Sequence, residues 1–64
     1  MSNQDEAKKY FFEGIKLYSK KDYSGAINEF EKSLRISPDR PSILLNLAKT
    51  YFKINNFKNA EKNL

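Results

Sequence analysis

Few residues in this chain of 64 could carry acid–base or nucleophilic chemistry, because the sequence contains no histidine and no cysteine. These are the usual general base, the thiol nucleophile and the soft metal ligands. Glu29 and Glu31 are close in sequence, but residues two apart point to different sides of a helix and cannot converge on one reacting atom. Glu31 is better interpreted as a surface partner of Arg35. The sequence therefore predicts that the protein is not an enzyme and uses no cofactor or metal.

The basic residues offer a second kind of chemistry, since 12 Lys and Arg against 8 Asp and Glu give a formal net charge of +4. Five lysines in one region alternate with Tyr and Phe, an arrangement that can contact phosphates and stack on bases. They are Lys8, Lys9, Lys16, Lys20 and Lys21. Glu13, Glu29 and Glu31 interrupt any continuous basic stripe. A solvated surface is the favoured interpretation, and a basic module that binds nucleic acid is kept as the alternative.

The spacing of apolar residues predicts the helices that must position these side chains. Large apolar residues recur at helical spacing between residues 5 and 19, and Ser2 can cap the start of this helix. Asp22 is a good N-cap for a second amphipathic helix. That helix is expected to end at Ser37–Pro38, because a residue that precedes proline avoids the helical region.

A third helix is predicted from Pro41, since proline suits the first helical turn. Asn55–Asn56 is expected to break this helix and to cap a partial fourth helix over residues 57–64. The most concentrated apolar stretch, residues 43–45, is far shorter than the roughly 20 residues of a membrane-spanning helix. The polar, acidic start differs from a secretory signal, so a cytoplasmic location is expected.

The chain matches itself when it is shifted by 34 residues, and the matched pairs keep their side-chain class. Gly14 aligns with Ala48, and Ala26 aligns with an identical residue, Ala60. The other pairs are Tyr10 with Leu44, Leu17 with Tyr51, Tyr18 with Phe52, Asp22 with Asn56, Tyr23 with Phe57 and Phe30 with Leu64. Such a period is typical of proteins built from structural repeats.

The period and pattern resemble the tetratricopeptide repeat, a helix-turn-helix unit with aromatic, Leu-Gly, Tyr, Ala, aromatic and Pro positions. The resemblance implies one all-α module over residues 1–64, with antiparallel helix-turn-helix repeats in an α-solenoid. Unit one would cover residues 7–40, and a truncated unit two would cover residues 41–64. Gly14 and Ala26 would lie where the helices of unit one cross, because small side chains allow close approach. Glu13 stands where the family usually has an apolar residue, so that side of the first helix is expected to be partly exposed.

In this family the first helices of successive units line a concave groove that receives a peptide or a partner helix. The resemblance therefore implies a scaffold for protein–protein interaction, with a partner that carries apolar anchors and some acidic groups. The residues it assigns to the groove are Lys8, Phe11, Phe12, Ile15 and Ser19 from unit one, and Ser42, Leu45, Asn46, Lys49, Phe52 and Lys53 from unit two. Equally open is that Phe11, Phe12 and Ile15 pack against a further helix or a second copy.

Some members of the family hold a terminal carboxylate with Lys and Asn side chains, and of those positions only Asn46 fits here. A generic hydrogen-bonding role is therefore expected for Asn46. Repeat arrays generally need three or more units, because each unit buries its apolar face against a neighbour. The sequence therefore predicts either a segment of a longer array, including a non-catalytic segment of a larger enzyme, or a homo-oligomer formed by pairing or helix exchange between copies.

Overall fold

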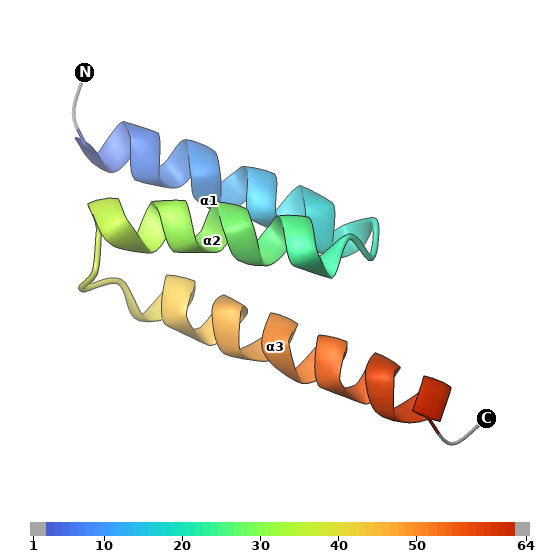
Figure 1. Ribbon diagram of the computed structural model, residues 1–64. Helices are drawn as coiled ribbons and strands as arrows, with labels where there is room; N and C mark the ends of the chain where they lie inside the picture. The colour runs from blue at the N-terminus through green and yellow to red at the C-terminus, as the bar shows by residue number, and fades with distance from the viewer. Residues whose placement is uncertain (1–2, 63–64) are drawn as a thin grey trace.

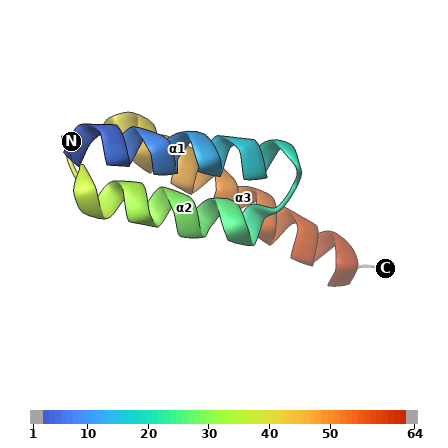
Figure 2. The same cartoon turned by 90° about the horizontal axis from the view of Figure 1, so that it is seen from above.

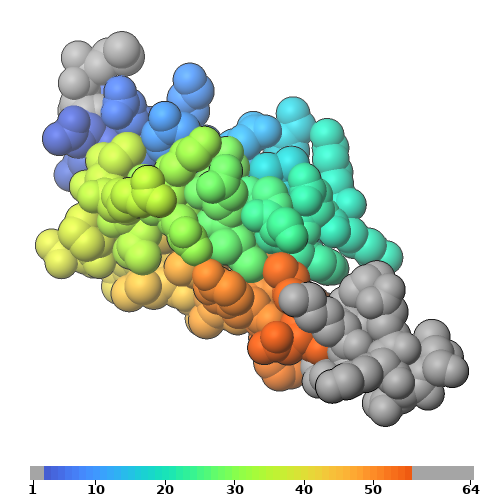
Figure 3. Space-filling view, in the orientation of Figure 1, coloured from blue at the N-terminus to red at the C-terminus, as the bar shows by residue number. Residues whose placement is uncertain are grey.

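The computed structural model describes residues 3–62, with side chains described for residues 3–55. It contains the helices α1 (Asn3–Ser19), α2 (Tyr23–Ile36) and α3 (Pro41–Lys62), and no strand in this part of the chain. Helix α2 lies between the other two and contacts both, and neighbouring helices run antiparallel (Figures 1 and 2). The space-filling view shows α2 side chains filling the surface between α1 and α3 (Figure 3). The prediction of an all-α fold of antiparallel helices is confirmed.

A tight turn at Lys20–Asp22 joins α1 to α2. Lys21 adopts a φ of 66°, which is uncommon for a residue with a side chain. The backbone amide of Asp22 donates to the carbonyl of Leu17 at 2.9 Å, and the carboxylate of Asp22 accepts from the amide of Gly25 at 3.1 Å. The predicted N-cap at Asp22 is confirmed, whereas the predicted cap Ser2 lies outside the described residues.

The core between α1 and α2 is built on the close approach that Gly14 permits. A Cβ atom placed on Gly14 would lie 2.6 Å from Cε1 of Phe30, and the Phe30 side chain is 0 % exposed. Ala26 is fully buried on the same helix as Phe30. Ser33 adds a polar contact, since its buried hydroxyl donates to the carbonyl of Ala7 at 2.7 Å. The prediction that Gly14 and Ala26 lie at the crossing of the two helices is confirmed.

The loop that contains Pro38 reverses the chain between α2 and α3. Helix α2 ends at Ile36, and the amide of Ser37 caps it by donating to the carbonyl of Ser33 at 2.9 Å. Pro41 then begins α3, as the sequence predicted, because proline lacks the amide that a first turn leaves unpaired. Ile43 follows it and is buried against the α1–α2 hairpin.

Helix α3 continues through Asn55–Asn56 to Lys62, so the predicted break and the separate fourth helix are wrong. Asn lowers helix stability by less than about 1 kcal/mol relative to Ala, and this stretch holds no Gly or Pro. A break there would gain stability only if the following segment packed back on α3. Ala48 is exposed, and α3 runs on to Lys62 without reversing over it.

Candidate functional site

Over the part of α3 whose side chains are described, one face holds the buried residues and the rest of the helix surface is mostly exposed. The inner face holds Ile43 and Thr50, which are buried, and Leu47 and Ile54, which are half-buried. The Thr50 hydroxyl donates to the carbonyl of Asn46 at 2.6 Å, so its buried polar group is satisfied within the helix. The exposed part carries large apolar side chains in contact with water.

The first exposed face of α3 carries the residues that the sequence assigned to a groove. Leu45 and Phe52 are 62 % and 65 % exposed, and Lys49 and Lys53 are exposed beside them. Ser42 is also exposed. Asn46 is half-buried, and its amide nitrogen donates to the carbonyl of Ser42 one turn earlier in α3 at 2.8 Å, so its role in the groove stays a prediction.

The corresponding residues of α1 divide into exposed and packed side chains. Phe12 is 64 % exposed. Phe11 is half-buried, with its ring centroid 5.8 Å from the rings of both Phe12 and Phe30, so it belongs largely to the α1–α2 core. Ile15 is half-buried as well, and its carbonyl accepts from the exposed Ser19 hydroxyl at 3.1 Å. Lys8 is exposed. Of these five residues, Lys8, Phe12 and Ser19 are exposed and so open to a partner.

A cation–π contact joins α1 to α3 on this side of the molecule. The Lys49 ammonium lies 5.9 Å from the centroid of the Tyr18 ring, and Tyr18 packs edge-on against Tyr23 at 5.4 Å. Sequence reasoning did not assign Tyr18 to the groove. The signal was present, because Tyr18 aligns with Phe52 at the same repeat position. We call the surface formed by Phe12, Tyr18, Leu45, Lys49 and Phe52 the groove face.

The groove face combines three exposed apolar side chains with an ammonium group. Exposed aromatic and aliphatic side chains supply anchors, and a Lys beside them favours an acidic group on whatever binds. Among the described residues, no cluster of acidic side chains is arranged to hold a metal ion. Apolar anchors beside an ammonium group are side chains suited to recognition.

The second exposed face of α3, here called the outer face, consists of Leu44, Ala48 and Tyr51. Leu44 and Tyr51 are 50 % and 46 % exposed. The Tyr51 hydroxyl donates to a carboxylate oxygen of Glu31 on α2 at 2.9 Å. This hydrogen bond stabilises the protonated phenol and raises the pKa of Tyr51 above 10.0. The predicted pair between Glu31 and Arg35 is not seen among the described residues, where the ion pair on α2 joins Lys32 to Glu29 at 3.3 Å.

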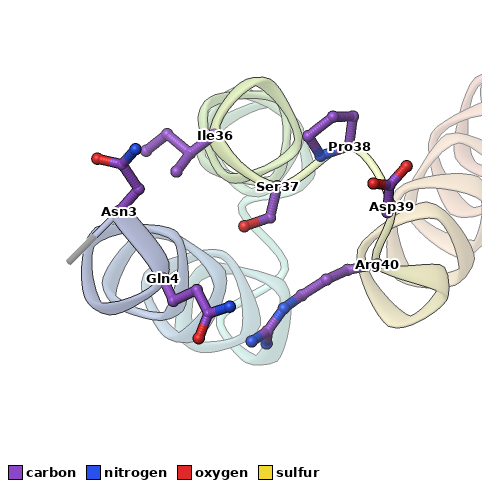
Figure 4. Close-up of a pocket in the computed structure, with 7 residues that line it drawn as sticks. All are labelled: Asn3, Gln4, Ile36, Ser37, Pro38, Asp39 and Arg40. Atoms are coloured by element: carbon purple, nitrogen blue, oxygen red, sulfur yellow. The ribbon is translucent and has the colours of Figure 1, made fainter.

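A pocket of about 280 Å³ lies away from both faces, where the start of α1 meets the loop between α2 and α3 (Figure 4). Gln4 and Arg40 extend toward each other from opposite sides of it (Figure 4). The pocket is lined by Asn3, Gln4, Ile36, Ser37, Pro38, Asp39 and Arg40. Its polar groups are of mixed charge, and it contains none of the residues that the sequence assigned to binding.

One of three comparisons with known proteins finds a match, and it agrees with the paired helices. Neither a curated protein nor a solved structure matches the chain. None of the described helices is both long enough and apolar enough to cross a membrane. The TPR repeat profile matches residues 14–55, more than half of the sequence, and such repeats serve in general as scaffolds for protein–protein interaction. The chain belongs to the tetratricopeptide repeat family.

Proposed function

We propose that the groove face binds a peptide or partner helix that carries apolar side chains and acidic groups. The observation that supports this proposal is the exposure of Leu45, Lys49 and Phe52 on α3 and of Phe12 on α1. Soluble proteins rarely leave large apolar side chains grouped in water unless another surface covers them. The contact between Lys49 and Tyr18 links the α1 and α3 parts of the face.

The expected affinity follows from the side chains that a partner would cover. Burying one large apolar side chain contributes about 1.5–3 kcal/mol relative to leaving it exposed. Three such side chains, already one-third covered, would contribute about 3–6 kcal/mol, and association itself offsets part of this gain. We therefore expect dissociation constants of about 40 µM or weaker. Such weak binding calls for a solution titration.

The test uses two synthetic amphipathic peptides with the same Leu and Phe positions, one with Glu and one with Lys at all other positions. Each is titrated into the ¹⁵N-labelled protein, and amide shifts are recorded. We expect the acidic peptide to shift amides around Phe12, Leu45 and Phe52, and the basic peptide to bind at least about tenfold more weakly. Lys49→Glu should weaken binding of the acidic peptide. Lys16→Glu, the same change at an exposed site outside the groove face, is the matched control.

Equal binding of the two peptides would refute the charge preference, and shifts confined to α2 would refute the groove face. A single-stranded oligonucleotide serves as a third probe. If it binds and weakens steeply with salt while the acidic peptide does not bind, a nucleic-acid module replaces the proposal. Self-association is the second kind of protein contact to consider, because the outer face is also apolar and exposed.

A further inference from the structure

We propose that the partner of the groove face is an amphipathic α-helix that docks antiparallel to α3. This helix carries two apolar side chains seven residues apart and one carboxylate four residues after the first of them. The inference rests on the peptide-binding function proposed above and adds the conformation, the direction and the charge position of the partner. Three exposed residues of α3, here called the α3 stripe, carry it: Leu45, Lys49 and Phe52.

The α3 stripe has an apolar side chain at each end and a cation between them. Residues at positions i, i+4 and i+7 lie within about 60° of one another around a helix, so the three side chains share one side of α3. With a rise of about 1.5 Å per residue, Leu45 and Phe52 are about 10.5 Å apart along the axis. A partner must therefore present two apolar groups at this separation.

This separation favours a helical partner over an extended one. In an extended segment, side chains on one face recur about every 6.6 Å, so two of them are about 6.6 or 13.2 Å apart. The residue at the intermediate distance, three positions on, points to the other face. A helix places residues j and j+7 on one face about 10.5 Å apart, which is the spacing of Leu45 and Phe52.

Lys49 lies to one side of the line between the two anchors, on the side that faces α1. Its ammonium is 5.9 Å from the centroid of the Tyr18 ring of α1. Among residues 3–55 the ion pair joins Lys32 to Glu29, so no carboxylate in this part of the chain neutralises Lys49. A carboxylate on the partner would therefore meet an unpaired ammonium at a defined edge of the stripe.

The position of the carboxylate along the partner depends on the direction in which that helix docks. In an antiparallel helix with anchors at j and j+7, residue j+4 lies on the edge next to Lys49, and residue j+3 lies on the opposite edge. In a parallel helix the two positions change places. Antiparallel docking is favoured because the dipoles of neighbouring helices then oppose each other, as they do between α2 and each of its neighbours (Figure 1).

Charge favours an acidic partner over a second copy of this chain on the α3 stripe. Placed antiparallel on α3, a second copy would present its own Leu45, Lys49 and Phe52 with the spacing j, j+4 and j+7. Its Lys49 would then lie beside Lys49 of the first copy, and the two ammonium groups would repel each other. A Glu or Asp at the same position would attract instead.

Two Ala-rich peptides of about 20 residues, long enough to populate a helix, test the carboxylate position. Both carry Leu at j and Phe at j+7. One has Glu at j+4 and Gln at j+3, and the other has these two exchanged, so their compositions are identical. Each is titrated into the ¹⁵N-labelled protein at low ionic strength, where screening is weak. We expect the j+4 peptide to bind about two- to fivefold more tightly, the range of an exposed ion pair.

Two variants and a spin label assign this preference. In Lys49→Met both peptides should bind equally, because methionine keeps an unbranched apolar side chain and removes the ammonium. Lys53→Met removes the same charge one turn further along α3 and is the matched control, which should keep the preference. A spin label at the N-terminus of the j+4 peptide should broaden amides near Lys53 more than those near Ser42, as antiparallel docking requires.

Three results would overturn this inference and leave the groove-face proposal in place. They are equal binding of the two peptides, tighter binding of the j+3 peptide, and a preference that survives Lys49→Met. If neither peptide binds, the fully acidic peptide described above separates the two proposals. Its binding would overturn this inference alone, and its failure to bind would overturn both.

Discussion

Replacing Gly14 with alanine adds one methyl group at the tightest point of the α1–α2 crossing. The new Cβ would lie 2.6, 2.7 and 3.0 Å from three atoms of the Phe30 ring. Ordinary carbon–carbon contacts are about 3.5–4.0 Å, so the ring or the helix must move by about 1 Å. Phe30 is completely buried and also contacts Phe11, which leaves the ring little room to move.

Two effects of opposite sign decide the stability of this variant. Alanine in place of glycine favours a helix by about 1 kcal/mol. Overpacking a tight core costs about 1–3 kcal/mol, and the contact here is close to the backbone of α1, which cannot swing aside as a flexible side chain could. We expect a net destabilisation of about 1–2 kcal/mol for Gly14→Ala, and a larger one for Gly14→Leu.

Urea denaturation followed by circular dichroism at 222 nm measures this difference. With a slope near 1 kcal/mol per M for so small a protein, the midpoint should fall by about 1–2 M. The Gly14→Ala/Phe30→Leu variant is the decisive partner, because the smaller leucine side chain makes room for the added methyl group. The two changes should therefore couple favourably by at least about 0.5 kcal/mol. An unchanged or raised midpoint for Gly14→Ala, or strictly additive effects, would refute the crossing geometry.

Two further predictions concern polar contacts between helices. Glu31→Gln should lower the pKa of Tyr51 toward 10, measured by phenolate absorbance at 295 nm, because the carboxylate that accepts the phenol proton is the main cause of its raised pKa. A raised folded-state pKa means that this contact stabilises the fold below about pH 10 and is lost as the pH rises through the pKa of Tyr51; an equal titration in both proteins would refute the contact. Ser33→Ala should cost about 0.5–1.5 kcal/mol in urea denaturation, because the buried hydrogen bond to the carbonyl of Ala7 is lost, and an unchanged midpoint would contradict its role.

Local signals were sufficient to predict the α1–α2 hairpin and the start of α3. Apolar spacing defined the helices, Asp22 supplied a cap whose partner is only three residues away, and Pro38 and Pro41 restrict the backbone directly. These effects act within a few residues, so the sequence alone reveals them. Gly14 required the repeat pattern in addition, since a glycine inside a helix is explained only by the ring that lies against it.

The end of α3 was not predictable in the same way, because Asn55–Asn56 is compatible with both a turn and a helix. At the α1–α2 turn the uncommon backbone of Lys21 is held in place by the helices that pack on either side. The equivalent turn in α3 would need the same packing to form. Whether a weak breaker ends a helix is therefore decided by tertiary contacts, which the spacing of residues does not contain.

The candidate site likewise contains residues that the sequence predicted and residues whose position depends on tertiary contacts. The exposure of Leu45 and Phe52 followed from their repeat positions, because those positions face away from the inner face of any such helix. Sequence reasoning gave Phe11 the same role, yet its ring packs on Phe30, since whether a position at the edge of a face points inward depends on the neighbouring helix. The hydrogen bond of Tyr51 also depends on a neighbouring helix, because its hydroxyl reaches a carboxylate 20 residues earlier in the chain.

One chain thus contains the same helical face twice, covered at Gly14 and uncovered at Ala48. The covered copy excludes a side chain, because the Phe30 ring fills the space that a methyl group would occupy. The uncovered copy already carries a methyl group in contact with water. Enlarging position 14 therefore acts on the folding of one chain, whereas enlarging position 48 acts only on what docks there. If both substitutions lowered the stability of the monomer alike, α3 would have a cover within its own chain, and the exposed outer face would not be available to a partner.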